Sequence, residues 1–354
     1  MTLTHEPLRF ERVDSLEEMR EDWSRLAELS GNVFLTWEWM AAWRQHRSAG
    51  ASWLALAGRD ASGALAAIVP LAVTRRGPLR IVRLMGHGPA DELGPVCAPE
   101  QRPRLRGAAS RALAEADAQL FLAEQLPGGY DWSTVLDGKL VRWEASPVIR
   151  ARDGGWEGYV ASRSANFREQ VRARERRLRR RHEVAYRRTD DPARLRADLE
   201  LLFALHRARW RAGTSAFRSE PFHFEFARAA LERGWLRLWF LELDGRAVAA
   251  WYGFRFGDVE VFYQSGRDPR WERESVGFVL LAHTIRDALD GGIREYRLLR
   301  GDEPYKYRFA DADPGVATVA TGRGVLGNAF VAAGGARHRH ARRSKESQQA
   351  TRLE

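Results

Sequence analysis

The sequence predicts an α/β protein of the α+β kind, with two mixed-sheet domains in tandem. Three observations support this prediction: the length of 354 residues exceeds what one hydrophobic core usually serves, the second half reads as three strands, a helix and a further strand, and the first half contains a similar strand–turn–strand unit. We expect domains at 1–150 and 151–330, because the Asp-Gly-Gly sequence within "ARDGGWEG" at 151–158 indicates a loop between two structured stretches. Residues 331–354 lack hydrophobic periodicity and are predicted to be a disordered basic tail.

The composition is that of a globular protein in a reducing compartment. Hydrophobic residues make up 44% of the chain, and Cys97 is its single cysteine, which excludes an intramolecular disulfide framework. Acidic pairs occupy the first 30 residues where a secretory signal would need an apolar run, and no stretch resembles a membrane helix. We therefore expect a soluble, cytoplasmic protein without a transmembrane segment.

The net charge of +10 is concentrated in two segments. Residues 168–188 carry ten Arg against three Glu, and residues 334–354 carry five Arg and one Lys against two Glu, so the remainder of the chain has a net charge of about −1. The fold as a whole is therefore not basic, which argues against a general nucleic-acid-binding surface.

Helices are predicted at the start of the second half. In the first of them, 165–181, the apolar residues Phe167, Val171 and Leu178 share one face, and arginine covers much of the rest. A second helix over 192–212 has an apolar core stripe that includes His206, which we expect to be packed, and a third covers about 222–233.

Three strands follow, at 235–243, 246–256 and 258–265, with Asp-Gly and Gly-Asp turns between them. The chain then forms a helix over 277–292 and returns as a strand over 293–299. The helical crossover allows this last strand to lie parallel to its predecessor in a mixed sheet.

The first half repeats part of this pattern. Residues 53–73 read "WLALAGRDASGALAAIVPLAV", and the second half has "LWFLELDGRAVAAWYGF" in the corresponding place. Hairpins with glycine turns are common, so internal duplication and a chance likeness both stay open.

These stretches carry a resemblance to a known family. The motifs "LHRARW", "LDGRAVAAWYGFRFGD", "VFYQSGRDP" and "SVGFVLLAHTIRDALDGGIREYRLLRGDEPYKYRF" resemble the GNAT acyltransferase superfamily, in the CelD-like and FemAB-related branch that pairs two GNAT-like domains. Val276 departs from the proline that the branch often has there. The resemblance implies two GNAT-like folds, the second being the acyltransferase domain. It also implies acyl transfer from acetyl-CoA or another acyl-CoA to an amine or hydroxyl of a small molecule or saccharide, for instance in polysaccharide or cell-envelope biosynthesis.

The candidate cofactor site is the junction of the third strand and the helix. Ser275 can cap this helix, Gly277 allows close approach to the backbone, and the helix N-terminus offers free N–H groups to a pyrophosphate. By resemblance, this is where a GNAT holds the pyrophosphate of coenzyme A. The candidate residues are Ser275, Val276, Gly277, Phe278, Arg267 and Arg273, with Arg270 nearby. An ordinary capped helix beside a solvated loop would also explain them.

The candidate catalytic residues lie at two strands. Glu260 and Tyr263 belong to the third strand, which in GNAT folds borders the acyl slot, although a half-buried strand pair explains them equally well. The motif "GDEPYK" ends the last strand, and by resemblance Asp302 or Lys306 orients the acceptor while Tyr305 donates a proton. Tyr305 and Lys306 are adjacent, so one is expected to pack while the other faces the cleft. A structural turn is the alternative.

Two other functions stay open. Neighbouring arginines on the helix within 168–188 repel one another, and an anionic partner would offset this repulsion. As that partner, sugar or lipid phosphate ranks above RNA, because aromatic residues are not interleaved with the arginines. The chain could therefore be a FemAB-like aminoacyltransferase that uses aminoacyl-tRNA, or a non-catalytic scaffold that binds an anion. We find no Walker loop, dinucleotide fingerprint or paired metal-ligand motif, and Cys97 lacks the setting of a nucleophile.

Overall fold

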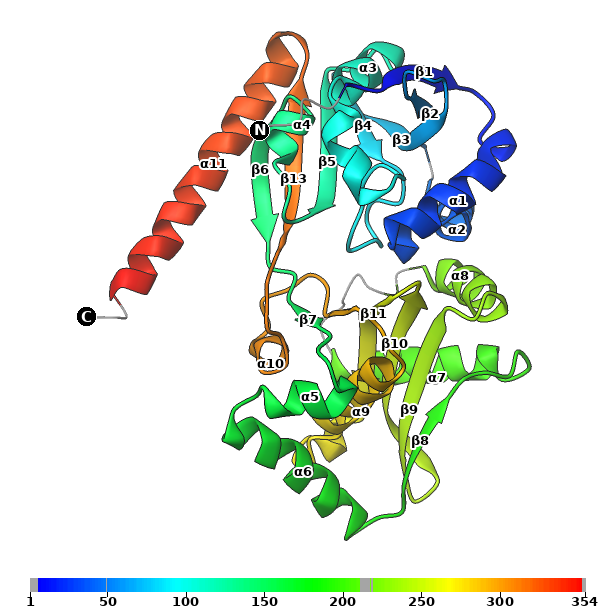
Figure 1. Cartoon of the computed structure of the whole chain (residues 1–354), viewed down its shortest axis with the longest axis vertical. Helices are drawn as coiled ribbons and strands as arrows, with labels where there is room; N and C mark the ends of the chain where they lie inside the picture. The colour runs from blue at the N-terminus through cyan, green and yellow to red at the C-terminus, as the bar shows by residue number, and fades with distance from the viewer. Residues whose placement is uncertain (1–5, 49, 211–216, 218, 352–354) are drawn as a thin grey trace. The chain divides into compact units, whose positions relative to one another are not determined.

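The computed structural model describes residues 6–48, 50–210, 217 and 219–351, which form two compact units (Figure 1). Unit 1 consists of 1–145 together with 314–354, and unit 2 is the continuous segment 146–313. Two predicted boundaries therefore change. The first moves from 150 to 145, and the residues after 313 belong to unit 1, not to the second domain.

Unit 1 contains a seven-stranded sheet in the order β1-β2-β3-β4-β5-β13-β6. Its strands are β1 (Arg9–Val13), β2 (Ser52–Arg59), β3 (Leu65–Arg76), β4 (Leu79–Leu84), β5 (Leu120–Pro127), β6 (Lys139–Glu144) and β13 (Val316–Gly322). Its helices are α1 (Arg20–Ser30), α2 (Trp37–Arg47), α3 (Ala108–Glu115), α4 (Trp132–Val135) and α11 (Gly324–Thr351).

Strand β13 explains the change of boundary. It pairs antiparallel with both β5 and β6, so the sheet of unit 1 is completed by a segment that follows unit 2 in the sequence. Helix α11 then packs along β6 and β13, and its Val331 is buried. The predicted tail at 331–354 thus begins inside a packed helix, while residues 352–354 lie outside the described residues. A pairing over such a long sequence separation leaves no local pattern.

Unit 2 contains a six-stranded mixed sheet in the order β7-β12-β11-β10-β9-β8. Its strands are β7 (Val148–Arg150), β8 (Val184–Arg188), β9 (Leu236–Leu243), β10 (Arg246–Phe256), β11 (Val259–Arg267) and β12 (Glu295–Arg297). Its helices are α5 (Gly155–Ala161), α6 (Ala165–Arg179), α7 (Leu195–Arg209), α8 (Glu220–Glu232), α9 (Val276–Asp290) and α10 (Pro304–Tyr307). The predicted antiparallel trio and the parallel return strand are confirmed.

The helices of unit 2 cover both faces of its sheet. Helix α9 packs against β9, β10 and β11, and α5 and α6 pack on α9. The predicted apolar face of α6 is confirmed, since Phe167, Val171 and Leu178 are buried in the same core cluster as α9. Helices α7 and α8 pack on β9, β10 and β11 from the other side, and the Nδ1 atom of the buried His206 lies 2.9 Å from the Ser265 carbonyl oxygen. Helix α7 ends at Arg209, and residues 211–212 of the predicted helix lie outside the described residues.

Strand β11 is irregular in a way that opens the sheet. Its register against β10 shifts between Tyr252 and Gly253, so Tyr263 is the extra residue of a β-bulge. Its pairing with β12 covers only Val259–Val261 against Glu295–Arg297. Within the described residues, the second half of β11 therefore has no paired strand on the β12 side.

Unit 1 has a related arrangement. The antiparallel strands β2, β3 and β4 are followed by β5, which pairs parallel with β4 over only three positions, Ile81–Arg83 against Leu120–Leu122. The two units therefore share an antiparallel trio and a short parallel pair. Among the described residues, no helix is both long enough and apolar enough to span a lipid bilayer.

Candidate active site

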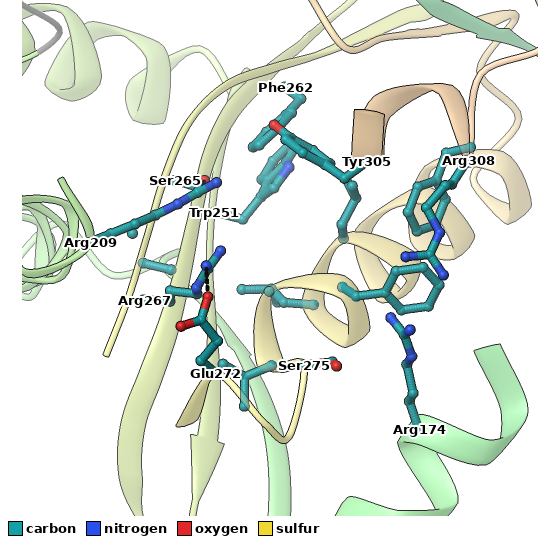
Figure 2. A pocket seen from close by; sticks show the side chains of 18 residues that line it. Arg174, Arg209, Trp251, Phe262, Ser265, Arg267, Glu272, Ser275, Tyr305 and Arg308 are labelled. Atoms are coloured by element: carbon teal, nitrogen blue, oxygen red, sulfur yellow. Dashed lines mark hydrogen bonds and ion pairs between the residues drawn. The ribbon is translucent and has the colours of Figure 1, made fainter. Parts of the chain in front are cut away.

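A cavity of about 370 Å³ lies in unit 2, where β11 loses its parallel neighbour (Figure 2). Helix α6, the end of α7, the first turns of α9 and the segment around α10 also contribute to its wall. The lining residues are Arg174, Arg209, Ala250, Trp251, Phe262, Ser265, Gly266, Arg267, Glu272, Ser275, Val276, Gly277, Phe278, Leu280, Leu281, Tyr305, Arg308 and Phe309.

The first turn of α9 forms one part of this wall. Ser275 precedes the helix in a left-handed conformation, with φ of 58°, and its side chain makes no capping hydrogen bond, which corrects the predicted side-chain cap. Its carbonyl oxygen instead accepts hydrogen bonds from the N–H groups of Phe278 and Val279. The N–H groups of Val276 and Gly277 precede any intrahelical acceptor, as at every helix N-terminus. A Cβ atom at Gly277 would come no closer than 3.7 Å to Arg267, which is an ordinary contact distance, so a methyl group would fit there.

An aromatic group forms the second part of the wall. The rings of Trp251 and Phe262 are stacked with centroids 5.9 Å apart, and the Tyr305 ring lies edge-on to Phe262 at 6.5 Å. Burial, followed by the charge of Glu303, raises the pKa of Tyr305 to about 12. The phenol is therefore a proton donor, not a phenolate, at neutral pH.

Arg209 reaches the cavity from the end of α7. Its Nη1 donates to Ser265 Oγ at 2.6 Å, and its charge opposes the rise in the pKa of Tyr305. Burial first, and then the nearby Arg267, lowers the pKa of Arg209. Arg267 itself is neutralised by Glu272 at 2.9 Å. Arg209 and Arg267 therefore bring two cations to the part of the cavity wall that contains Tyr305.

Two further arginines lie close to the ring of Phe278. The guanidinium of Arg174 lies 4.3 Å from the Phe278 ring centroid and that of Arg308 lies 5.1 Å from it. Both also donate to the same acceptor, Gln170 Oε1. Burial lowers the pKa of Arg174, and the positive charges of Arg308 and Arg177 lower it further. Its neighbours therefore disfavour the charged form of Arg174.

Five of the six predicted cofactor-binding residues line the cavity: Ser275, Val276, Gly277, Phe278 and Arg267. Arg273 does not line it; its side chain is exposed and its carbonyl oxygen accepts a hydrogen bond from Arg177. Arg270 is exposed and paired with Asp268 at 2.6 Å.

Of the predicted catalytic residues, only Tyr305 lines the cavity. Glu260 is fully buried beside Arg237, at 3.6 Å, and burial raises its pKa to about 8. Tyr263 is buried on the opposite face of the sheet, near His223 and Tyr252. The sequence placed both residues on the right strand, but their side chains enter packed cores because the bulge and the overlying helices decide which positions of β11 face open space.

The residues of the "GDEPYK" motif also differ in whether their side chains reach the cavity. Lys306 is buried and points to backbone carbonyls, while Asp302 is exposed and lies outside the cavity lining. The expectation that one of the adjacent pair packs and the other faces the cleft is met by Lys306 and Tyr305 respectively. Cys97, in unit 1, is fully buried, and burial raises its pKa to about 12.

The cavity also contains residues that the sequence did not single out, chiefly Arg174, Arg209, Trp251 and Arg308. Arg209 stands in the quoted motif "LHRARW", and Arg174 in the arginine-rich helix, so motif position was an available signal for both. Trp251 and Arg308 also stand in quoted motifs, but their approach to the cavity depends on how β10 and α10 pack.

Comparison with known proteins identifies part of the chain. Residues 165–307 match the model of the acetyltransferase (GNAT) domain family. No curated protein matches the chain in sequence. Among solved structures, FemX is similar with a TM-score of 0.65 at 11% identity, over 88% of this chain and 97% of that one.

Another similar structure is the C-terminal domain of a putative lysylphosphatidylglycerol synthetase from Agrobacterium fabrum. It has a TM-score of 0.57 at 12% identity, over 86% of this chain and 92% of that one. A conserved protein of unknown function from Bacteroides thetaiotaomicron has a TM-score of 0.56 at 12% identity, over 88% and 98%. At these identities the likeness concerns the fold, which extends over both units.

Proposed function

Residues 165–307 form a GNAT-type acetyltransferase domain, and on this premise we propose that the chain is an acyl-CoA-dependent acyltransferase that acts on an amine or hydroxyl acceptor. The observation that carries the proposal is the cavity at the unpaired part of β11. It joins a helix N-terminus with a cluster of arginines at one part of its wall and an aromatic group with Tyr305 at another.

Each part of the wall suits one part of an acyl-CoA. The N–H groups at the start of α9 suit the pyrophosphate. The aromatic rings of Trp251 and Phe262 suit the apolar acyl end, and unpaired backbone N–H groups along the second half of β11 can polarise the thioester carbonyl. Val276 and Gly277, both predicted as cofactor-binding, thus take that role in the proposal through their backbone N–H groups.

In the proposed transfer, the acceptor's nitrogen or oxygen forms a bond to the carbonyl carbon of the thioester as the carbon–sulfur bond breaks. The acceptor loses a proton, and the departing thiolate gains one. Tyr305 is the proton donor to the thiolate, because its phenol faces the cavity in the neutral form. Arg209 lines the same cavity and places a positive charge near Tyr305. Polysaccharide and cell-envelope acceptors remain part of the proposal.

The test is thermal unfolding of the full chain with and without acetyl-CoA. A ligand that binds only the native state stabilises it by RT ln(1 + [L]/Kd), about 2.7 kcal/mol at a hundredfold excess over Kd. We expect this shift in the wild type and in Gly277→Ala, whose added Cβ has ordinary contact distances, but not in Gly277→Phe, whose ring would fill the space beside Arg267. The absence of a shift in the wild type, with acetyl-CoA and longer acyl-CoAs alike, would overturn the proposal.

A second candidate function is aminoacyl transfer from aminoacyl-tRNA. The observation in its favour is that Arg174, in the cavity wall, belongs to the same helix as the exposed arginines of α6. This continuity would suit an RNA backbone that leads to the cavity. Stabilisation by aminoacyl-tRNA but not by acetyl-CoA would favour this candidate. If neither ligand stabilises the protein, the GNAT fold serves here as a scaffold for another anion.

A further inference from the structure

A row of arginines extends from the cavity along α6. Arg174 and Arg177 are three residues apart in α6, so they lie on the same side of the helix. Arg174 lines the cavity, and Arg177 Nη2 donates to the carbonyl oxygen of Arg273 at 3.0 Å, in the loop just before α9. The row therefore passes directly beside the N-terminus of α9.

Three cations at this place lack a carboxylate partner. The ion pairs of α6 itself join Arg176 to Glu169 and Arg179 to Glu175. Across the part of the chain that the structure describes, no carboxylate lies within ion-pair distance of Arg174, Arg177 or Arg308. The repulsion among these positive charges contributes to the lowered pKa of Arg174, and a bound anion would offset this repulsion.

Two of these cations are also held in place. Arg174 and Arg308 lie over the Phe278 ring and share the Gln170 acceptor, so their guanidinium groups are oriented before any ligand arrives. A freely solvated arginine face would need neither contact. An oriented pair of guanidinium groups favours a multivalent anion such as a phosphate monoester.

We propose that Arg174, Arg177 and Arg308 form a second phosphate site, which binds the 3′-phosphate on the ribose of the acyl-CoA. This inference rests on the proposed function and adds a specificity to it. The first turn of α9 can serve the pyrophosphate, and the arginine row beside it then meets the remaining phosphate of the nucleotide. The site would make the protein select a 3′-phosphorylated nucleotide over one that lacks this group.

The experiment compares the affinities of coenzyme A and 3′-dephospho-coenzyme A by isothermal titration calorimetry with the full chain. In the wild type we expect 3′-dephospho-coenzyme A to bind at least about tenfold more weakly, as for the loss of one charge-assisted contact. In Arg177→Gln and Arg174→Gln this ratio should fall toward one. Arg172→Gln is the matched control, because Arg172 is exposed on another side of α6, and it should retain the wild-type ratio.

The ratio between the two ligands separates the possible results. Equal affinities in the wild type overturn the second phosphate site and leave the proposed function standing. If Arg177→Gln lowers the affinity for both ligands by the same factor, the second phosphate site is also overturned, since the arginine would then contact a group that both ligands share. If neither ligand binds the wild type, the proposed function itself fails. Arg177 is exposed, so Arg177→Gln should fold, and the test can be made with this variant even if Arg174→Gln does not fold.

Discussion

The ammonium of Lys306 lies 2.5 Å from the carbonyl oxygen of Arg300 and donates a hydrogen bond to it. It also donates to the Leu299 carbonyl oxygen at 3.1 Å and pairs with Glu303 at 3.0 Å. The turn that it holds contains Leu299 with φ of 57° and Gly301 with φ of 124°. Lys306 thus ties together the turn that precedes Tyr305, and its ammonium faces this turn.

Lys306→Met should destabilise the protein by about 1–3 kcal/mol, because it leaves buried carbonyl oxygens without a donor. The free energy of unfolding from chemical denaturation measures this effect. Asp302→Asn is the matched control in the same turn, since Asp302 is exposed, and its effect should stay within about 0.5 kcal/mol. Equal stabilities of the two variants would contradict the structural role of Lys306.

Glu260 should make stability depend on pH in the opposite sense to an ordinary ion-paired carboxylate. Burial raises its pKa from 4.5 to about 8, with Arg237 opposing the rise. The native state therefore holds this proton more tightly than the unfolded chain does. Its contribution is fully present below about pH 4.5 and is lost as the pH rises toward about 8.

Glu260→Gln removes this titration while it keeps the side chain's size. The stability of the variant relative to wild type should increase steadily between about pH 4.5 and pH 8. Urea unfolding at several pH values provides the comparison. Two curves that run parallel across this range would show that Glu260 does not titrate as expected.

Tyr305→Phe should lower the rate of acyl transfer by about 10²-fold or more, because it removes the proposed proton donor but keeps the ring against Phe262. The affinity for acetyl-CoA should change little. Release of coenzyme A with an accepted substrate measures the rate, and calorimetry measures the affinity. A variant with the wild-type rate would exclude Tyr305 as the donor.

The pKa of about 12 adds a second expectation for Tyr305. The phenol should stay protonated throughout the range in which the protein is folded, so ionisation of Tyr305 should not cause a loss of activity between neutral pH and about pH 10. An alkaline loss that is present in the wild type and absent in Tyr305→Phe would contradict this expectation.

Deletion of residues 314–354 should disrupt unit 1, because it removes β13 from between β5 and β6. Hydrogen exchange should then be fast for the amides of β5 and β6 and remain slow for those of β9, β10 and β11. Slow exchange in β5 and β6 of the shortened chain would show that this part of unit 1 does not need β13.

Elements with a local pattern could be predicted from the sequence. The apolar spacing of Phe167, Val171 and Leu178 predicted the buried face of α6, and the Asp244-Gly245 turn predicted the hairpin of β9 and β10. The start of α9 was likewise predicted as a site, and residues there do line the cavity. Such features depend on neighbours within a few residues, which the sequence lists in order.

The set of side chains that meet in the cavity could not be predicted, because it depends on the folded arrangement of distant segments. Arg174, Arg209 and Arg308 come from separate helices and converge through packing, and the bulge at Tyr263 turns that side chain away from the open part of the sheet. In the same way, β13 joins unit 1 through pairing with strands that lie far earlier in the chain. The physical reason is that burial and long-range strand pairing depend on the whole fold, whereas periodicity, turns and helix ends depend on the local chain.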